Sequence, residues 1–474
     1  MAAPPALRRT SIRDRLGQAV AKTPGRIAGG FVLVVAAALL AGAVNLVAAT
    51  NAATSIRIVG RDAEPSVVLA LQIGAVMADL DATATNDALA AGVSAAGTSR
   101  RWRDGKAELD RLVIEASRNI TYPDETTALQ GVLRWTGEYH AALAEARDTA
   151  DPGRPFLPLQ RLQRSHWLLR DFALPQADAL AFANRKPLLD GYDAYRTSSW
   201  RDGGAAALTV ALLAAVLVVL QVFLTRRTRR LINAPAAAAT LLGLCLIGGL
   251  LAITLKERES LRAARFDCYA SLDPLYSAKV VAAEMNADLS LWLLDPAGRP
   301  AALQAFETEA RALLDLDWRD ASAVNRYRAE LDAAQAIERR GEAANALAAV
   351  HAQAGLLGKE LANISFGTAE RDPATEAVRS LLAFLQVADR VRKLTSPSQM
   401  PEAVQLREGP GAQALARLTS ALDATIAVNQ VEFDRDISEA RRLVGLTPGI
   451  ACGALLAAVL LAAAGLWQRY REYA

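Results

Sequence analysis

The amino-acid sequence predicts an all-α membrane protein with four transmembrane helices and two extracytoplasmic up-down helical bundles that arose by internal duplication. Three observations lead to this prediction. The chain of 474 residues contains four apolar runs of about 20 residues, long enough to cross a bilayer. Two long segments between these runs have helical periodicity, and a short sequence pattern occurs once in each of them.

The four apolar runs contain no Asp, Glu, Lys or Arg, whereas buried helices of soluble proteins usually keep a polar stripe. The first run is too long, and begins too far from the N-terminus, for a cleaved secretion signal. We therefore expect an uncleaved anchor followed by three further spans. The predicted spans cover residues 27–49, 204–224, 234–255 and 447–467.

Basic residues next to the spans predict the orientation, because positively charged segments resist translocation. The N-terminal segment 1–26 carries six Lys or Arg against one acid, and four arginines lie in the short loop 225–233. We expect both to be cytoplasmic, together with the tail 468–474. Segments 50–203 and 256–446 would then lie outside a multi-pass protein of the plasma or inner membrane.

Both extracytoplasmic segments show one apolar face at helical spacing. No run alternates apolar and polar residues as a strand would, and Gly- and Pro-rich breakers divide each segment into four or five helices. The faces consist of Ala70, Ile73, Met77 and Leu80 in the first segment and of Val281, Met285, Leu289 and Trp292 in the second.

A sequence match supports the duplication. In each segment a proline is followed by twelve residues and then Ala-Asp-Leu, with Pro65 and Pro274 separated by 209 positions. A second match pairs DALAFAN (178–184) with DATIAVN (423–429) at a separation of 245, which requires an insertion of 36 residues (245 minus 209) in the second copy. The alternative is that two Ala-rich helices agree by composition alone.

Catalytic chemistry finds little support in the sequence. The three histidines have no metal-ligand spacing, and no nucleophile or phosphate-loop motif occurs, so we expect no enzyme activity, metal or cofactor. His140 and His166 adjoin aromatic residues and are expected to pack at helix surfaces. The net charge of +3 gives no argument for nucleic acid, and spans without ionisable residues argue against transport.

Three groups of residues are candidates for contacts. A polar run in the first segment contains Asp79, Asp81 and Asn86, which could receive a ligand or a binding protein or could simply be a solvated helix face. The loop arginines Arg226, Arg227, Arg229 and Arg230 could contact a cytoplasmic partner, or serve only as the orientation signal and contact anionic lipid. Gly445, Gly449 and Gly453 form a ladder of small residues typical of transmembrane helix packing.

The arrangement of span, helical segment and span resembles the four-helix-bundle sensor modules of bacterial chemoreceptors and sensor kinases. EPSVVLALQIGAVMADLDATATNDALAAG (64–92) resembles the first helix of such a module, here present twice. The chain lacks the long cytoplasmic coiled coil or kinase domain of those receptors. A closer resemblance is to four-span membrane proteins of actinobacteria that work with a glutamine-binding lipoprotein and the soluble protein kinase G. KTPGRI (22–27), RWTGEYHAALAEARD (134–148) and LPQADALAFANR (174–185) carry it.

This resemblance implies amino-acid sensing with an extracytoplasmic solute-binding partner and a separate cytoplasmic kinase. We therefore expect a transmembrane sensor whose output passes through helix displacement. A structural scaffold in the envelope that responds to no ligand is the alternative. The sequence leaves open whether the two copies pair within one chain or across a homodimer.

Overall fold

The computed structural model of the chain describes residues 23–148, 156–228, 233–340, 346–347 and 355–473. Within these residues every regular element is a helix and no strand occurs, which confirms the all-α prediction. The chain divides into two compact units. The membrane unit comprises Met1–Arg57, Gly191–Leu261 and Ile437–Ala474, and the ectodomain unit comprises Ile58–Asp190 and Arg262–Asp436.

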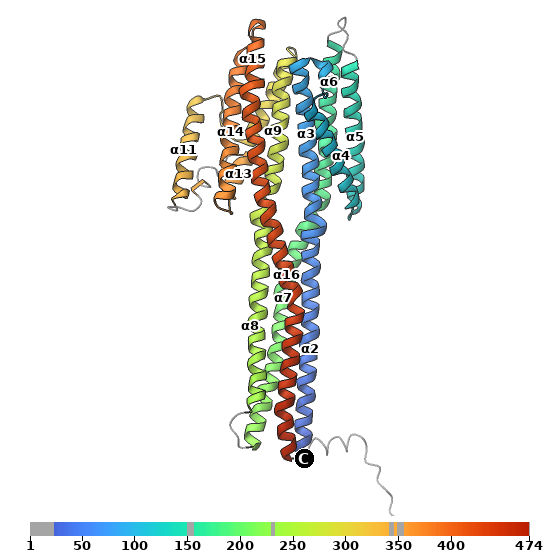
Figure 1. Cartoon of the computed structure of the whole chain (residues 1–474), viewed down its shortest axis with the longest axis vertical. Coiled ribbons are helices and arrows are strands. Elements are labelled where there is room, and N and C mark those ends of the chain that lie inside the picture. The colour runs from blue at the N-terminus through green and yellow to red at the C-terminus, as the bar shows by residue number, and fades with distance from the viewer. Residues whose placement is uncertain (1–22, 149–155, 229–232, 341–345, 348–354, 474) are drawn as a thin grey trace, which may run out of the picture. The chain divides into compact units, whose positions relative to one another are not determined.

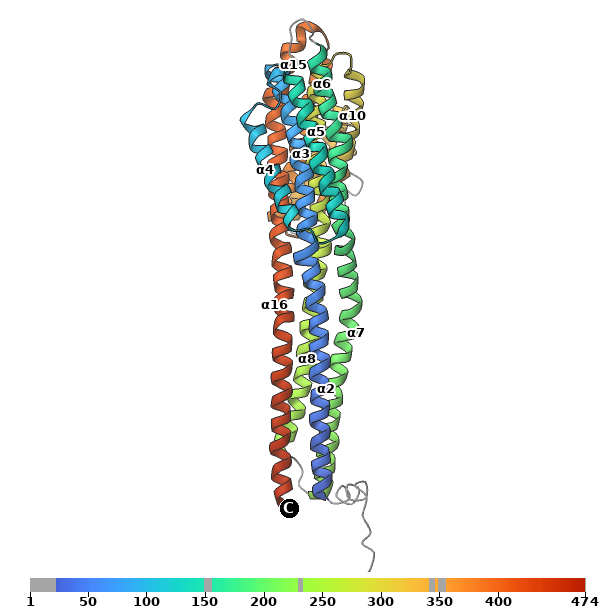
Figure 2. The same ribbon diagram turned by 90° about the vertical axis from the view of Figure 1, so that its right-hand side faces the viewer.

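Four helices pass through the membrane unit side by side (Figures 1 and 2). Among the described residues these are the helices long and apolar enough to cross a membrane, and each contains one predicted span. The chain is therefore a four-span membrane protein in architecture. The helices are α2 (Thr23–Arg57), α7 (Leu174–Thr228), α8 (Ala234–Ala263) and α16 (Ala412–Tyr473).

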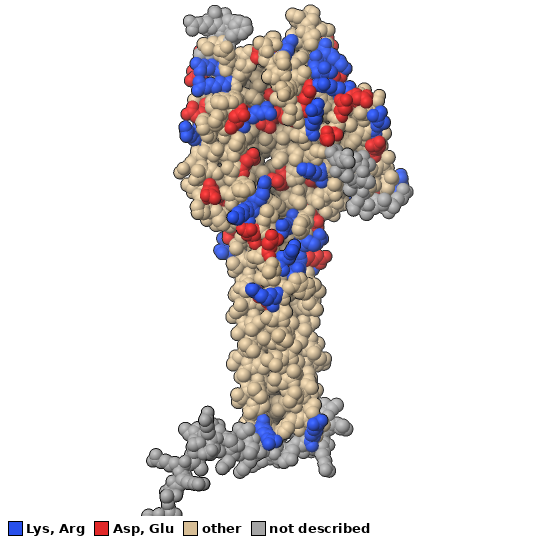
Figure 3. Space-filling model, turned by 180° about the vertical axis from the view of Figure 1, so that it is seen from behind, with Lys and Arg blue, Asp and Glu red and all other residues tan. Residues whose placement is uncertain are grey.

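The spans pack through an apolar cluster to which all four helices contribute. On the face shown in Figure 3, the middle of this unit displays no Lys, Arg, Asp or Glu. Its few polar groups are bonded inside the unit, as a hydrocarbon environment requires. Gln221 Nε2 donates to Thr240 Oγ1 at 2.8 Å, and Asn233 Nδ2 donates to the backbone oxygen of Gly465 at 3.0 Å.

The glycine ladder of the fourth span is placed differently from the prediction. Gly445, Gly449 and Gly453 face away from the other helices, and no atom lies within 4 Å of the position a Cβ would take on any of them. The opposite side of α16, which carries Ala451 and Leu455, faces the core instead. Packing through these glycines is therefore not a contact within this chain.

The first half of the ectodomain unit consists of α3 (Glu64–Ala91), α4 (Arg100–Arg118), α5 (Pro123–Asp148), α6 (Phe156–Leu168) and the beginning of α7. The second half consists of α9 (Ala270–Leu294), α10 (Arg299–Leu313), α11 (Ala321–Arg339), α13 (Gly355–Ala362), α14 (Thr368–Lys393), α15 (Met400–Leu406) and the beginning of α16. Two short 3₁₀ helices, Val93–Ala95 and Pro397–Gln399, lie in connections.

The two halves form one compact unit because α3 and α9 pack along each other (Figure 1). Both helices are buried on most sides, as expected for helices that are apolar nearly all round. Gln72 Nε2 donates to Tyr276 Oη at 3.0 Å, and Ser290 Oγ donates to Asn86 Oδ1 at 2.8 Å. Both pairs are separated by 204 positions, so the helices run parallel and in a constant register.

Four short π-helical segments, Ile58–Ala63, Leu169–Ala173, Ala264–Tyr269 and Arg407–Gly411, occupy similar places in the two halves. One precedes α3 and one precedes α9. The other two precede α7 and the long helix α16. Such segments insert an extra residue into a helix and are frequent at functional sites.

Hydrogen bonds also recur between the halves. Asn119 Nδ2 donates to Ser66 Oγ at 2.7 Å, and Asn363 Nδ2 donates to Ser271 Oγ at 2.8 Å. Positions 66 and 271 are 205 apart, so these bonds make equivalent positions of α3 and α9 differ by 205, four fewer than the 209 of the proline match.

The later helices repeat with the predicted separation of 245. Glu125, near the start of α5, accepts bonds from two backbone N–H groups just before the helix, and Glu370 does the same at the start of α14. Asn184 and Asn429 are fully buried, and each donates to the backbone oxygen four residues earlier. These recurrences support the duplication, which stays a prediction.

Contact between α3 and α9 predicts a specific cross-link. The Cβ position of Gly74 lies 3.9 Å from Val280 Cγ2, so a cysteine at position 74 would lie next to the side chain of a cysteine at position 280, within reach of a disulfide. We expect the Gly74→Cys, Val280→Cys variant to form an intrachain disulfide on mild oxidation, measured by peptide mass spectrometry. Gly137→Cys with Val280→Cys is the control, because no atom lies within 4 Å of a Cβ at Gly137. Intermolecular bonds alone would contradict the packing.

Candidate functional site

The polar run of the first segment lies on α3, but its three candidate residues have different surroundings. Asp79 is about half exposed and forms an ion pair with Arg101 at 2.7 Å. Asp81 is buried, and Asn86 accepts hydrogen bonds at the contact with α9. The three candidates therefore do not form one exposed face: Asp79 is in a solvent-facing ion pair, Asp81 is buried, and Asn86 is half-buried at the contact with α9.

His166 bridges the two halves of the ectodomain. Its Nδ1 atom lies 2.5 Å from Asp81 Oδ2 on α3, and its Nε2 atom lies 3.6 Å from Asp288 Oδ1 on α9. The imidazole comes from α6, and its side chain is only 13% exposed. A protonated ring donates toward both carboxylates, so one cation links the two central helices.

Arg170 extends this charged cluster toward α10. It belongs to the π-helical segment Leu169–Ala173, and its guanidinium contacts Asp288 Oδ2 at 2.9 Å and Glu309 Oε1 at 2.5 Å. Glu284 Oε1 lies farther away, at 3.6 Å from Arg170 Nε. Asp288 thus contacts both cations, and four carboxyl groups surround two positive charges.

The surroundings of these groups change their pKa values. Burial by itself would lower the pKa of His166, but the charge of Asp81 and hydrogen bonds to both aspartates outweigh it and raise the pKa to about 10. Burial and the charge of Asp288 raise the pKa of Glu309. A protonated Glu309 relieves the repulsion among the carboxyl groups, so the cluster tolerates its burial.

Arg407 forms a second polar site at the α3–α9 contact. It begins the π-helical segment Arg407–Gly411 and is only 3% exposed. Its guanidinium donates to Asn86 Oδ1, to Asn286 Oδ1 at 2.6 Å and to Ser290 Oγ at 3.1 Å. All three acceptors are neutral, and within the described part of the chain no carboxylate forms an ion pair with Arg407.

Most of these residues were not recognised in the sequence. His166 was expected at a helix surface, but the structure places it between two buried aspartates because α6 lies over the α3–α9 contact. Arg170 and Arg407 carry no local motif. A usable signal was the presence of Asp81 and Asp288 on helices otherwise apolar on most sides, since buried carboxylates require partners.

The candidate cytoplasmic contact is only partly described. Arg226 is exposed at the end of α7. Arg227 lies in the last turn of α7, where its side chain is not described, and Arg229 and Arg230 lie outside the described residues.

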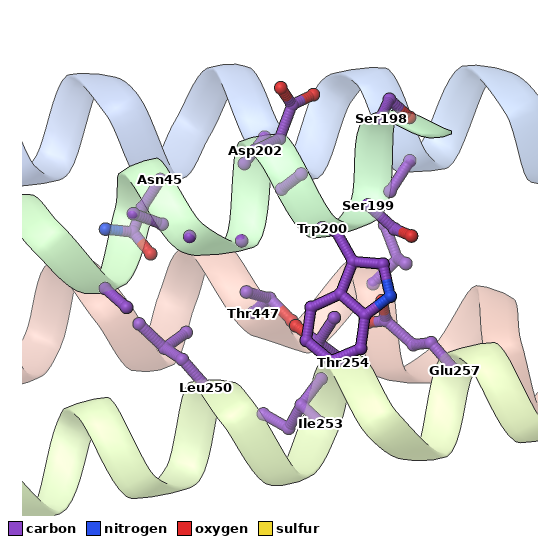
Figure 4. A pocket seen from close by; sticks show the side chains of 18 of the residues that line it. Asn45, Ser198, Ser199, Trp200, Asp202, Leu250, Ile253, Thr254, Glu257 and Thr447 are labelled. Atoms are coloured by element: carbon purple, nitrogen blue, oxygen red, sulfur yellow. The ribbon is translucent and has the colours of Figure 1, made fainter. Parts of the chain in front are cut away.

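A cavity of about 130 Å³ lies within the membrane unit, between α2, α7, α8 and α16 (Figure 4). Small residues and the side chains of Asn45, Trp200 and Thr447 line it. Glu257 also lines this cavity and accepts a hydrogen bond from Tyr195 Oη at 3.2 Å. This bond gives the Glu257 carboxyl group a partner within the membrane unit.

Removing the bridging charge should destabilise the ectodomain. We expect His166→Gln to lower the free energy of unfolding by about 3–5 kcal/mol, because it leaves buried carboxylates without their shared cation. His140→Gln is the matched control, because burial lowers the pKa of His140 to about 4 and the ring carries no charge near neutral pH. We expect it to cost about 1 kcal/mol in urea unfolding followed by circular dichroism. Equal losses would contradict the bridge.

The same cluster predicts a fall in stability at alkaline pH. Folded His166 keeps its proton up to about pH 10, whereas the unfolded side chain releases it near its ordinary pKa of 6.5. The stabilisation is therefore complete below pH 6.5 and is lost as the pH rises through 10, and the raised pKa of Glu309 acts in the same direction. Urea unfolding between pH 6.5 and about pH 9 should show this decline, and His166→Gln with Glu309→Gln should flatten it. A decline of unchanged slope in that double variant would assign it to other groups.

Residues 55–193 match the family model of the actinobacterial sensor domain. The match covers the first half of the ectodomain unit, including Asp81, His166 and Arg170. Comparison with curated proteins and with solved structures found no match. This segment is thus similar to a family of sensor domains from actinobacteria, which supports a sensing role.

Proposed function

We propose that the chain is a transmembrane sensor that relays an extracytoplasmic solute signal to a separate cytoplasmic partner. The observation that carries the proposal is the sensor-domain match over residues 55–193, in a chain with four helices able to cross a membrane. In this proposal the chain catalyses no reaction itself, and its localisation is the plasma or inner membrane.

The arrangement of helices supports a mechanical route for the signal. The helix α7 begins directly after the π-helical segment that holds Arg170, and α16 begins directly after the one that holds Arg407. Each then continues without a break to the end of a predicted span, over 55 residues in α7 and 62 in α16. A shift of either arginine at the α3–α9 contact can therefore move a helix that crosses the membrane.

The partners follow from the resemblance and from the topology. We propose that an extracytoplasmic lipoprotein binds the amino acid and provides the input. A soluble protein kinase receives the output in the cytoplasm. With both termini cytoplasmic, the inner surface is limited to residues 1–26, 225–233 and 468–474. The basic loop that contains Arg226, Arg227, Arg229 and Arg230 is then the natural contact for the kinase.

A charge-conserving variant can separate partner binding from topology. Replacing all four loop arginines by lysine keeps the positive charge that orients the spans. It removes the planar guanidinium groups, each of which can bind a carboxylate through two parallel hydrogen bonds. We expect normal insertion and a phosphorylation response to amino-acid limitation that is reduced roughly 10-fold. The response is measured in cells by phosphopeptide mass spectrometry.

Topology is controlled in the same cells by labelling single cysteines placed near positions 120 and 340, both of which should react from outside. The matched variant replaces Arg100, Arg103, Arg111 and Arg118 of α4 by lysine and should respond normally. An unchanged response in the loop variant would remove the loop from the output route. A response that is absent from the wild-type chain under every stimulus would favour the scaffold.

A further inference from the structure

Two arginines with opposite surroundings contact α9: Arg170, whose side chain is 30% exposed, and Arg407, which is only 3% exposed. The carboxylate of Asp288 lies 2.9 Å from Arg170 and the carboxyl group of Glu309 also contacts it, whereas Arg407 is bonded to amide and hydroxyl oxygens only. Transfer of a charge from water into a protein interior is costly unless an opposite charge compensates it. Among the described residues Arg407 therefore has no ion-pair partner; the charge of the exposed neighbour Glu408 only partly offsets the effect of burial on the pKa of Arg407.

The predicted repeat, in the register of the hydrogen bonds at Ser66 and Ser271, aligns a carboxylate of α3 with an amide of α9. Asp81 on α3 and Asn286 on α9 are 205 positions apart, the same separation as Ser66 and Ser271, which make equivalent hydrogen bonds. The position that carries a carboxylate in the first half thus carries a neutral amide in the second. Arg407 contacts that amide.

A cavity of about 300 Å³ opens beside Arg407, which is the lower end of the range of about 300–1,000 Å³ found for small-molecule sites. Its polar lining includes Asn86, Asn286 and Arg101 beside Arg407 itself, and residues of α16 form the opposite wall. Asp423 also lines the cavity but forms an ion pair with Lys279 at 2.5 Å. Of the acidic side chains in the lining, none is therefore free to neutralise Arg407.

The two asparagines complete a receptor for an anion. Their Oδ1 atoms accept from the guanidinium, so their Nδ2 groups remain as donors, and these Nδ2 groups bond to no other described residue. A planar guanidinium with adjacent amide donors matches the geometry of a carboxylate, which accepts two parallel hydrogen bonds. Burial lowers the pKa of Arg407 to about 10, so the group still carries its charge near neutral pH.

We propose that the cavity beside Arg407 binds a small molecule through a carboxylate group, which acts as the counter-ion that the chain itself omits. This deepens the proposed function, on which it rests, by giving the ectodomain a direct ligand site of its own. The ligand would contact α3 through Asn86, α9 through Asn286 and the start of α16 through Arg407. One small anion would then hold together the helices through which the signal passes.

The test is calorimetric titration of the full-length chain in lipid nanodiscs with two matched pairs of probes. L-alanine is compared with L-alaninamide, and succinate with succinamide, because each amide has nearly the same shape but no carboxylate. We expect at least one carboxylate of the two pairs to bind and its amide partner to bind at least roughly 10-fold more weakly. Equal affinity within both pairs, or no heat of binding from either carboxylate, would overturn the proposal. Inorganic phosphate bound as tightly as the better carboxylate would also overturn it, because the site would then select charge alone.

Two variants locate the site. Asn286→Asp replaces the amide whose Oδ1 atom lies 2.6 Å from Arg407 Nη2 by a carboxylate. It should weaken binding of the carboxylate ligand roughly 10–100-fold and raise the unfolding midpoint of the chain. Arg407→Met should abolish binding, and Arg417→Met, an exposed arginine on the same helix, should not. If Arg407→Met does not fold, Asn286→Asp decides alone. Unchanged affinity in Asn286→Asp would place any binding elsewhere and refute the site.

The outcomes separate this site from the proposed function. Binding that disappears in Asn286→Asp, without any phosphorylation response in wild-type cells, would support the site and contradict the sensor. A normal cellular response together with no carboxylate binding to the purified chain would support the sensor and contradict the site, leaving a separate binding protein as the input.

Discussion

Burial of charge between α3 and α9 is the constraint on which the rest of the ectodomain depends. Asp81 and Asp288 lie on helices that are otherwise packed closely, and one imidazolium from α6 compensates both. Such a pair adds little net stability compared with an apolar contact, because desolvation offsets the attraction, but it permits few alternative registers. A slip of either helix by one turn would leave a buried carboxylate without a cation. The cluster therefore mainly fixes the register of α3 against α9. Two parallel helices rich in Ala and Leu would otherwise have no strong preference for one register.

The same constraint connects the ectodomain to the spans. The helices that follow the two arginine-bearing π-helical segments are α7 and α16, and both continue as uninterrupted helices to the ends of spans. Helices in a bilayer must satisfy their backbone groups internally, so they move as rigid rods rather than by local unfolding. In the proposed sensor, displacement of such a helix at one end would therefore be transmitted to its other end. A loop between ectodomain and span would have absorbed it.

The sequence predicted what depends on composition and period, namely the helical class, the four spans and the apolar faces of α3 and α9. Ala70, Ile73, Met77 and Leu80 are all buried, as their spacing requires. It did not predict what depends on tertiary contact. His166 stands beside Trp167 in a pattern typical of a helix surface, and only the packing of α6 over two other helices brings it to Asp81 and Asp288. The glycines of the fourth span have a spacing suited to close packing, but within this chain the core-facing side of α16 carries Ala451, Leu455 and Ala458 instead, so a contact through the glycines stays a prediction.

The two halves of the ectodomain differ in the groups that surround Arg170 and Arg407. A duplicated helix pair with identical polar sites would be compensated at both arginines and would have no reason to respond to a solute. Here Arg170 contacts carboxyl groups of the chain itself, whereas Arg407 contacts the neutral side chains of Asn86, Asn286 and Ser290. The site at Arg170 fixes the register of α3 and α9 permanently, so the site at Arg407 can change its occupancy without the pair coming apart. A stable contact and a responsive one can then share a single helix interface, because Arg170 contacts an anion of the chain itself and the cavity beside Arg407 leaves space for an external one.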